Sequence, residues 1–178
     1  NVANLINMKS YTCTLDQLSK WITMSVFIAL LIPVITIANI TFHQQTLAER
    51  LAFIFTFILL GTGLSLAYLW KPLKIELNNE FLIVKRKIGD KKFPLATIQS
   101  AAFVTKKELG FGIRIFGSGG FFGYYGLFKY KNIGTVNLYC TKREEMVLIT
   151  LTKGKILLSP DKHLEFLNDL DNIKKAPK

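Results

Sequence analysis

Two long apolar runs dominate the first 70 residues of this chain. Ile22 to Phe42 and Leu51 to Trp70 each hold about twenty residues and contain no Asp, Glu, Lys or Arg. A helix of that length, at about 1.5 Å per residue, matches the roughly 30 Å hydrocarbon core of a bilayer. A helix in a soluble protein normally keeps a polar stripe, whereas these runs are apolar all round. The sequence therefore predicts a transmembrane helical hairpin over residues 21–70.

Basic residues set the expected orientation of this hairpin. Lys9 and Lys20 precede the first run and Lys71 and Lys74 follow the second, whereas the connector between the runs carries only Arg50. Because Lys and Arg concentrate in cytoplasmic loops, both termini are expected in the cytoplasm and the connector outside.

The part of the chain after the hairpin carries nearly all of the net charge. Of 23 Lys and Arg, 20 follow Trp70, as do 10 of the 12 Asp and Glu, so residues 71–178 hold a formal +10 of the total +11. On a free soluble domain this excess would favour nucleic acid. On a domain held at a cytoplasmic membrane face, anionic lipid is the nearer counter-charge, at about 1 kcal/mol per basic residue. We therefore expect a membrane partner and no nucleic acid. A basic surface that serves only topology and solubility is the alternative.

After Pro72 the pattern changes to short alternating runs, which indicate strands. About seven antiparallel strands are expected, with turns such as Asn78-Asn79 and Gly89-Asp90. Ser159-Pro160-Asp161 has the hydroxyl, proline and carboxylate typical of a helix start, and apolar residues at three-and-four spacing follow it. The expected fold class is α+β: a two-helix transmembrane hairpin, then an antiparallel β-barrel or sandwich capped by a C-terminal helix.

A glycine-aromatic stretch, Gly117 to Gly126, is the most specific motif of the chain. Together with Leu95-Ala96-Thr97-Ile98 and the segment Ile156 to Asp161, it resembles the bacterial pleckstrin-homology (PH) domain family over roughly residues 71–171. In some members of that family a PH-like barrel follows a membrane hairpin. The resemblance implies a binding or scaffolding module, not an enzyme, in a bacterial cytoplasmic (inner) membrane that the chain crosses twice.

The expected domain organisation follows from these patterns. It comprises an N-terminal cytoplasmic segment (1–20), the transmembrane hairpin (21–70), a PH-like domain (71–173) and a C-terminal tail (174–178). Met8 followed by Lys9 is a plausible true start, which leaves the origin of residues 1–7 open.

A basic hairpin is the best candidate for an anionic contact. The candidate lipid- or anion-binding residues are Lys74, Lys85, Arg86, Lys87, Lys91 and Lys92. In eukaryotic PH domains the phosphoinositide site uses basic residues on the first two strands, and Lys74, Lys85 and Lys87 resemble that spacing loosely. Non-specific attraction to anionic phospholipid and a solvated strand face are the alternatives.

The glycine-aromatic stretch has two interpretations. Its glycines let the backbone turn and bulge so that the aromatic rings pack into the barrel. Alternatively, Phe121, Phe122, Tyr124 and Tyr125 form an exposed loop that enters the lipid interface or a partner's groove. A nucleotide loop is excluded, because no helix opened by Gly-Lys-Ser/Thr follows these glycines.

Catalytic chemistry has little support in this sequence. His43 and His163 lack a recognisable nucleophile partner, and Cys13 and Cys140 form no CxxC pair. We expect no catalytic residue, no metal and no cofactor. The leading hypothesis is a membrane-anchored module that contacts a protein partner or anionic lipid; the alternative is a homo-oligomeric assembly protein with no small ligand.

Overall fold

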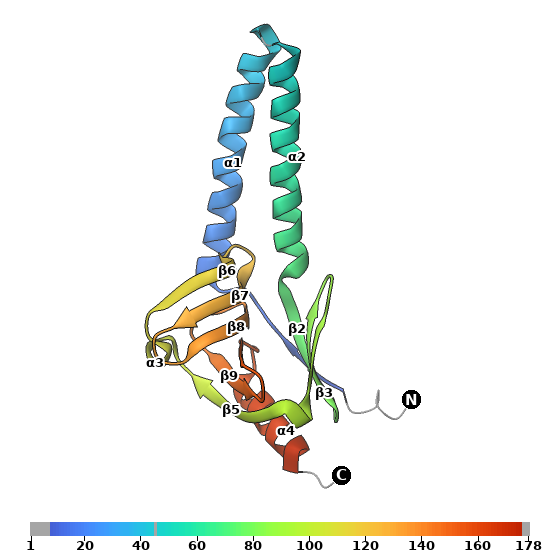
Figure 1. Ribbon diagram of the computed structural model, residues 1–178, viewed down its shortest axis with the longest axis vertical. Helices are drawn as coiled ribbons and strands as arrows, with labels where there is room; N and C mark the ends of the chain where they lie inside the picture. The colour runs from blue at the N-terminus through green and yellow to red at the C-terminus, as the bar shows by residue number, and fades with distance from the viewer. Residues whose placement is uncertain (1–7, 45, 176–178) are drawn as a thin grey trace.

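The computed structural model describes residues 8–44 and 46–175, and side chains outside 37–45. Two long helices, α1 (Gln17–Gln44) and α2 (Leu47–Trp70), extend from one end of a β-rich domain (Figure 1). Both are long and apolar enough to cross a membrane, and no residue of α2 is buried in the protein. The core helix of a soluble protein would bury one face, so exposure all round is typical of a helix in lipid.

The two helices lie side by side without close packing at their small residues. A Cβ atom added at Gly61 or Gly63 would meet no atom within 4 Å. The attachments of α1 and α2 to the β-rich domain therefore position the hairpin.

The first sheet contains a strand that the sequence patterns did not predict. Its four strands are antiparallel and lie in the order β1 (Lys9–Thr12), β2 (Pro72–Leu77), β3 (Phe81–Arg86) and β4 (Lys91–Pro94). β1 precedes the helical hairpin, yet Lys9 pairs with Leu77 and Thr12 pairs with Lys74. The hairpin is thus inserted between two neighbouring strands of one sheet. Part of the expected N-terminal segment packs with the domain.

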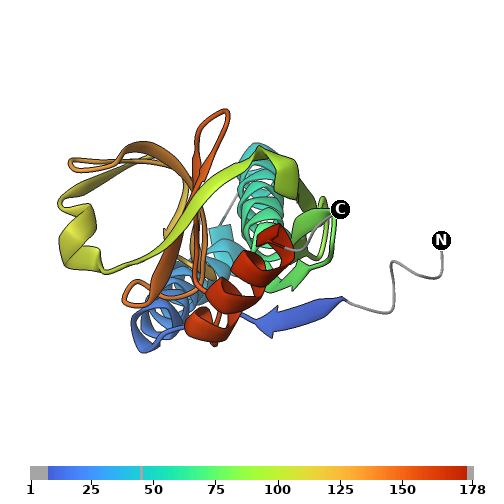
Figure 2. The same ribbon diagram turned by 90° about the horizontal axis from the view of Figure 1, so that it is seen from below.

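The second sheet has six strands in the order β5-β9-β10-β8-β7-β6. They are β5 (Ile98–Val104), β6 (Gly112–Gly120), β7 (Gly123–Tyr130), β8 (Gly134–Cys140), β9 (Met146–Leu151) and β10 (Lys155–Leu158). β10 pairs with β8 in parallel, so the all-antiparallel expectation is wrong at this pair. Figure 2 shows the sheet curling, but its end strands β5 and β6 do not pair, so the barrel stays open.

Short helices and one C-terminal helix complete the fold. η2 (Leu95–Thr97) and α3 (Lys106–Leu109) flank β5, and α4 (His163–Lys175) follows β10. Phe166 and Leu170 of α4 are buried in the main core, which contains residues from both sheets. The α+β class with a terminal helix is confirmed, with an open sandwich of ten strands in place of about seven.

The expected start of the last helix is wrong in detail. α4 begins at His163, and the Oγ of Ser159 instead accepts hydrogen bonds from the backbone N–H groups of Thr141 and Lys142, at 2.7 and 3.2 Å. Ser159 therefore anchors the segment after β8 rather than capping the helix.

Candidate functional site

The turn between β6 and β7 lies against the base of α1. The Oγ of Ser19 donates to the carbonyl of Gly120 at 2.6 Å, and the N–H of Phe122 donates to the Oγ1 of Thr23 at 3.0 Å. A Cβ at position 120 would stand 2.6 Å from Cδ1 of Ile22, so glycine permits this approach. The glycine-aromatic stretch thus docks the domain onto the helical hairpin.

Phe121 and Phe122 bridge the two long helices. The ring of Phe27 in α1 lies 6.0 Å from that of Phe121 and 6.1 Å from that of Phe122, centroid to centroid. Tyr68 of α2 lies 5.2 Å from Phe122 on the other side. Both phenylalanines are half-buried.

Tyr124 and Tyr125 are buried and add two further attachments. The hydroxyl of Tyr124 donates to Oδ1 of Asp16 at 3.3 Å, and burial raises the pKa of Tyr124 to about 12. The hydroxyl of Tyr125 donates to the carbonyl of Ala67 in α2 at 2.5 Å. All four predicted aromatic residues therefore contact the hairpin or the segment that leads into it.

Two of the predicted basic residues, Lys74 and Lys85, form ion pairs with carboxylates. Lys74 Nζ lies 2.7 Å from the carboxylate of Glu76, and Lys85 Nζ lies 3.8 Å from its other oxygen. Lys85 also lies 2.7 Å from Asp90, and its hydrogen bond holds the pKa of that carboxyl below its usual range. Glu76 is only 3% exposed, so it supplies a fixed counter-charge to Lys74 and Lys85.

Lys87 and Lys71 lie over an aromatic ring at the end of α2. Lys87 Nζ is 4.1 Å from the ring centroid of Tyr68 and donates to its hydroxyl at 2.7 Å, while Lys71 Nζ is 4.6 Å from the same centroid. A cation over an aromatic face gains about 0.5 to 1 kcal/mol at an exposed site. These contacts therefore hold both ammonium groups beside the base of α2.

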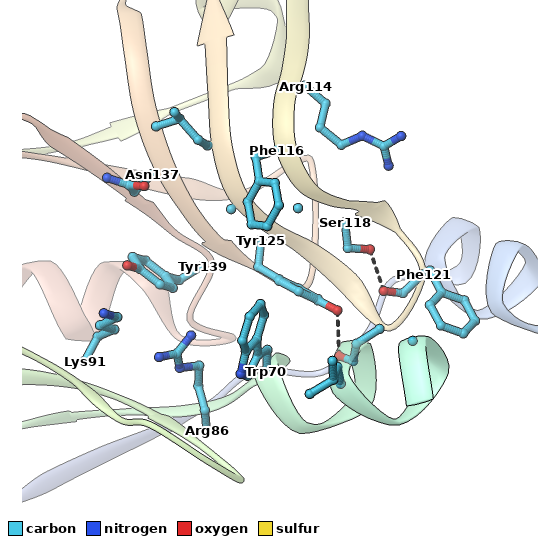
Figure 3. Close-up of a pocket in the computed structure, with 16 residues that line it drawn as sticks. Trp70, Arg86, Lys91, Arg114, Phe116, Ser118, Phe121, Tyr125, Asn137 and Tyr139 are labelled. Atoms are coloured by element: carbon cyan, nitrogen blue, oxygen red, sulfur yellow. Dashed lines mark hydrogen bonds between the residues drawn. The ribbon is translucent and has the colours of Figure 1, made fainter. Parts of the chain in front are cut away.

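Arg86 and Lys91 line a cavity of about 710 Å³. It lies between α2, the β3–β4 hairpin and strands β6 to β8 (Figure 3). Its aromatic lining residues are Trp70, Phe116, Phe121, Tyr125 and Tyr139. Lys92, the neighbour of Lys91 on β4, is exposed and by strand alternation points to the other face.

Arg114 of β6 is a third basic residue of this cavity, and sequence reasoning missed it. Its Nη1 lies 3.3 Å from where a Cβ on Gly119 would stand, so its side chain runs toward the helix-proximal end of β6. Across residues 8–44 and 46–175 its guanidinium has no hydrogen bond or ion pair. The signal in the sequence is a lone charge between Ile113 and Ile115.

Five basic residues thus lie at the end of α2 or line the cavity beside it. Among the described residues, none of the five forms an ion pair with a carboxylate. We call them the juxtamembrane cations: Lys71, Arg86, Lys87, Lys91 and Arg114. The nearby Asp90 is paired with Lys85 and accepts the backbone N–H of Arg86 at 3.0 Å. The N–H of Ile88, at the tip of the same hairpin, donates to the carbonyl of Leu69 in α2 at 3.4 Å.

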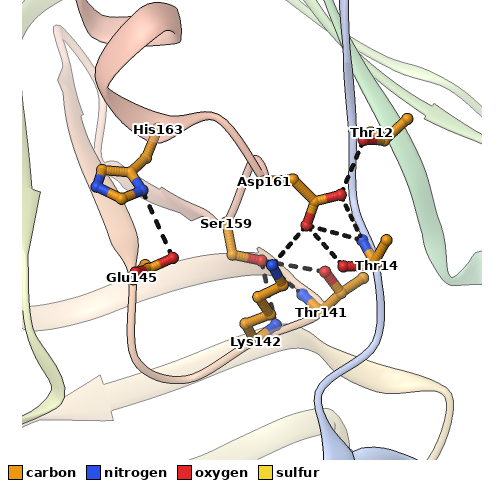
Figure 4. Close-up of polar contacts among 8 residues, drawn as sticks. All are labelled: Thr12, Thr14, Thr141, Lys142, Glu145, Ser159, Asp161 and His163. Carbon is orange, nitrogen blue, oxygen red and sulfur yellow. Dashed lines mark hydrogen bonds and ion pairs between the residues drawn. The ribbon is translucent and has the colours of Figure 1, made fainter.

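A second polar cluster, at the start of α4, holds the fold together (Figure 4). Asp161 accepts from the hydroxyls of Thr12 and Thr14, at 2.8 and 2.7 Å, and pairs with Lys142 at 2.6 Å. Burial opposes its ionisation, but these donors outweigh burial and lower the pKa of Asp161 to about 2. The cluster ties the segment before α1 to the start of α4.

The histidine of this region is held by packing. The imidazole of His163 stacks on Phe103 at 4.9 Å between centroids, and its Nδ1 lies 3.6 Å from a carboxylate oxygen of Glu145. Among the described residues, no group of three or more His, Cys, Asp or Glu side chains is placed to hold a metal ion.

Comparison with known proteins agrees with this architecture. A family model described as Bacterial PH domain matches residues 73–173. The matched segment runs from β2 into α4 and leaves out β1, α1 and α2. No curated protein and no solved structure matches the chain.

Proposed function

The chain belongs to the bacterial PH domain family, whose members are binding or scaffolding modules, and we propose that it is a membrane-anchored module of this kind. Its domain holds anionic lipid headgroups, or a protein partner, at the cytoplasmic face of a bacterial inner membrane. α1 and α2 are the anchor, crossing the membrane twice.

The absence of carboxylate partners around the juxtamembrane cations carries this proposal. They gather at the base of α2, where the headgroups of a bilayer spanned by the helices would lie. Anionic headgroups attract a basic residue near the surface by about 1 kcal/mol each. A lysine already paired to a fixed carboxylate contributes less.

Two tryptophans support the proposed position of the membrane surface. Trp21 in the first turns of α1 is 69% exposed, and Trp70 at the end of α2 is 41% exposed. Tryptophan is enriched at the boundary between hydrocarbon and water. Because β1 and β2 pair in one sheet, both helices leave the domain on the same side.

The full chain in lipid nanodiscs tests the role of anionic lipid. We expect phosphatidylglycerol to raise the thermal midpoint above its value in phosphatidylcholine, with the gain shrinking as salt is added. The double variant Lys71→Gln/Lys87→Gln should reduce that gain, whereas the matched variant Lys106→Gln/Lys107→Gln on α3 should keep it. Equal midpoints in both lipids for the wild type would refute the lipid role.

Orientation has its own test. A membrane-impermeant maleimide applied to intact cells should label Thr46→Cys, before α2, and should leave Lys153→Cys, in the β9–β10 turn, unlabelled until the membrane is opened. The reverse pattern would place the domain outside.

An assembly role is the second candidate, and the free edge of β6 favours it. Ile113 is 59% exposed, Phe116 is 66% exposed, and the preceding Phe111 is 75% exposed, on a strand with no partner on its outer side. An exposed apolar edge can pair with another strand. Light scattering of the detergent-solubilised chain tests this role, which a strict monomer would exclude.

A further inference from the structure

The cavity beside α2 combines an apolar side and a cationic side. α2 contributes Gly63, Leu66, Ala67 and Trp70, whereas the β strands contribute Arg86, Lys91 and Arg114. No carboxylate is found among its sixteen described lining residues. An amphiphile with an acidic headgroup has this same division of chemistry.

The apolar side is continuous with the surface of the membrane helix. Gly63 and Ala67 are four residues apart and so share a face of α2, and a Cβ at Gly63 would meet no atom within 4 Å. The small side chains leave open space along the helix above Trp70. In a bilayer this space is filled from the lipid side.

The cationic side is built to receive an external anion. Among the described residues, the guanidinium of Arg86 donates only to the carbonyl of Gly89 in its own turn, and the ammonium group of Lys91 on the neighbouring strand has no hydrogen bond or ion pair. Guanidinium groups bind phosphate oxygens in two-point geometry. Asn137 adds an amide to the same wall.

We propose that this cavity binds one anionic phospholipid, with its phosphate at Arg86 and Lys91, which lie side by side in Figure 3, and its acyl chains along Gly63 to Trp70. This inference rests on the proposed function and adds a defined site to it. The volume of about 710 Å³ lies within the range of about 300 to 1,000 Å³ typical of small-molecule sites. A lipid fits better than free phosphate because most of the wall is apolar and leads onto α2.

Trp70 is a reporter inside the proposed site. The chain has two tryptophans, so the variant Trp21→Phe leaves Trp70 as the only one. In nanodiscs, lipids with brominated acyl chains quench a tryptophan that they touch. We expect brominated phosphatidylglycerol at low mole fraction to quench Trp70 with about fivefold or greater preference over brominated phosphatidylcholine.

Substitutions then separate this site from general charge attraction. Arg86→Gln should lower the preference about fivefold, and the matched variant Lys107→Gln, exposed on α3, should leave it unchanged. Glycerol phosphate at millimolar concentration should not displace the lipid; displacement as complete as that by phosphatidylglycerol would overturn the lipid assignment in favour of free phosphate.

The two proposals fail in different ways. If phosphatidylglycerol raises the thermal midpoint but quenching of Trp70 shows no preference, or the preference does not change in Arg86→Gln, the defined site is refuted and the general function stands. If neither measurement distinguishes the two lipids, both are refuted.

Discussion

Two sets of basic residues on one domain differ in whether the protein supplies their counter-charge. Lys9, Lys85 and Lys142 lie 2.6, 2.7 and 2.6 Å from carboxylates. The juxtamembrane cations lie against aromatic rings, carbonyl groups or open space. The paired set serves the fold, and the unpaired set is available to an outside anion. A formal charge of +10 therefore says less about binding than the placement of a few acidic residues.

The largest expected effect comes from breaking the paired set at Asp161. Asp161→Asn removes the ion pair to Lys142 and weakens the bonds from Thr12 and Thr14, at a cost of about 2 kcal/mol. For a domain of this size that corresponds to roughly 8 to 16 °C in thermal midpoint. Thermal melting of the full chain in neutral nanodiscs measures this loss of midpoint. The rise in midpoint caused by phosphatidylglycerol should stay as in the wild type. A change in that rise would mean that the two sets are coupled.

The same residue predicts a dependence on pH. Because its folded-state pKa is lowered from 3.8 to about 2, ionised Asp161 stabilises the fold at neutral pH, and this contribution is lost as pH falls from about 4 to 2. The difference in midpoint between wild type and Asp161→Asn should be constant from pH 7 to 5 and should close below pH 4. A difference that closes above pH 5 would contradict the assignment.

Glu76→Gln should convert one paired lysine, Lys74, into an unpaired one. It frees Lys74 and leaves Lys85 with Asp90, at a cost of about 1 kcal/mol, since both ammonium groups are partly exposed. The rise in thermal midpoint caused by phosphatidylglycerol should become larger than in the wild type, and added salt should remove this difference. An unchanged rise would show that pairing does not decide which cations reach lipid.

The smallest expected effect comes from two neighbouring lysines on β4. Lys91 lines the cavity and Lys92 points away, and neither should change the midpoint in neutral lipid by more than about 0.5 kcal/mol. Lys91→Gln should lower the preference for phosphatidylglycerol in Trp70 quenching, whereas Lys92→Gln should not. Equal effects would indicate diffuse attraction rather than a site.

Sequence patterns that extend over many consecutive residues made most of the fold predictable. Twenty-residue apolar runs and the amphipathic spacing of the last helix are local signals, and both elements are present. β1 was missed because only one of its four side chains, Tyr11, is buried and because its partner lies beyond the hairpin. The parallel pairing of β10 with β8 likewise depends on which strands meet, which alternation does not encode.

The candidate site was predictable only in part. The aromatic stretch predicted from the sequence contacts the hairpin or the segment before it, but the basic residues divide into paired and unpaired ones, and spacing alone did not separate Lys74 from Arg86. Lys74 and Glu76 are two residues apart on a strand, so they share a face, and that signal was present in the sequence. Arg114 joins the cavity only because β6 folds back beside α2.

The pairing of β1 with β2 has a consequence for biosynthesis. The ribosome makes β1 first, but its partner β2 emerges only after both long helices, and at about 5 to 20 residues per second that delay is roughly 3 to 14 s. Tyr11 and Lys9 then reach Asp169 only when α4 has been made. In the proposed topology, the sheet closes only in a chain whose two helices have returned to the side where they began, so completion of the domain would report correct insertion.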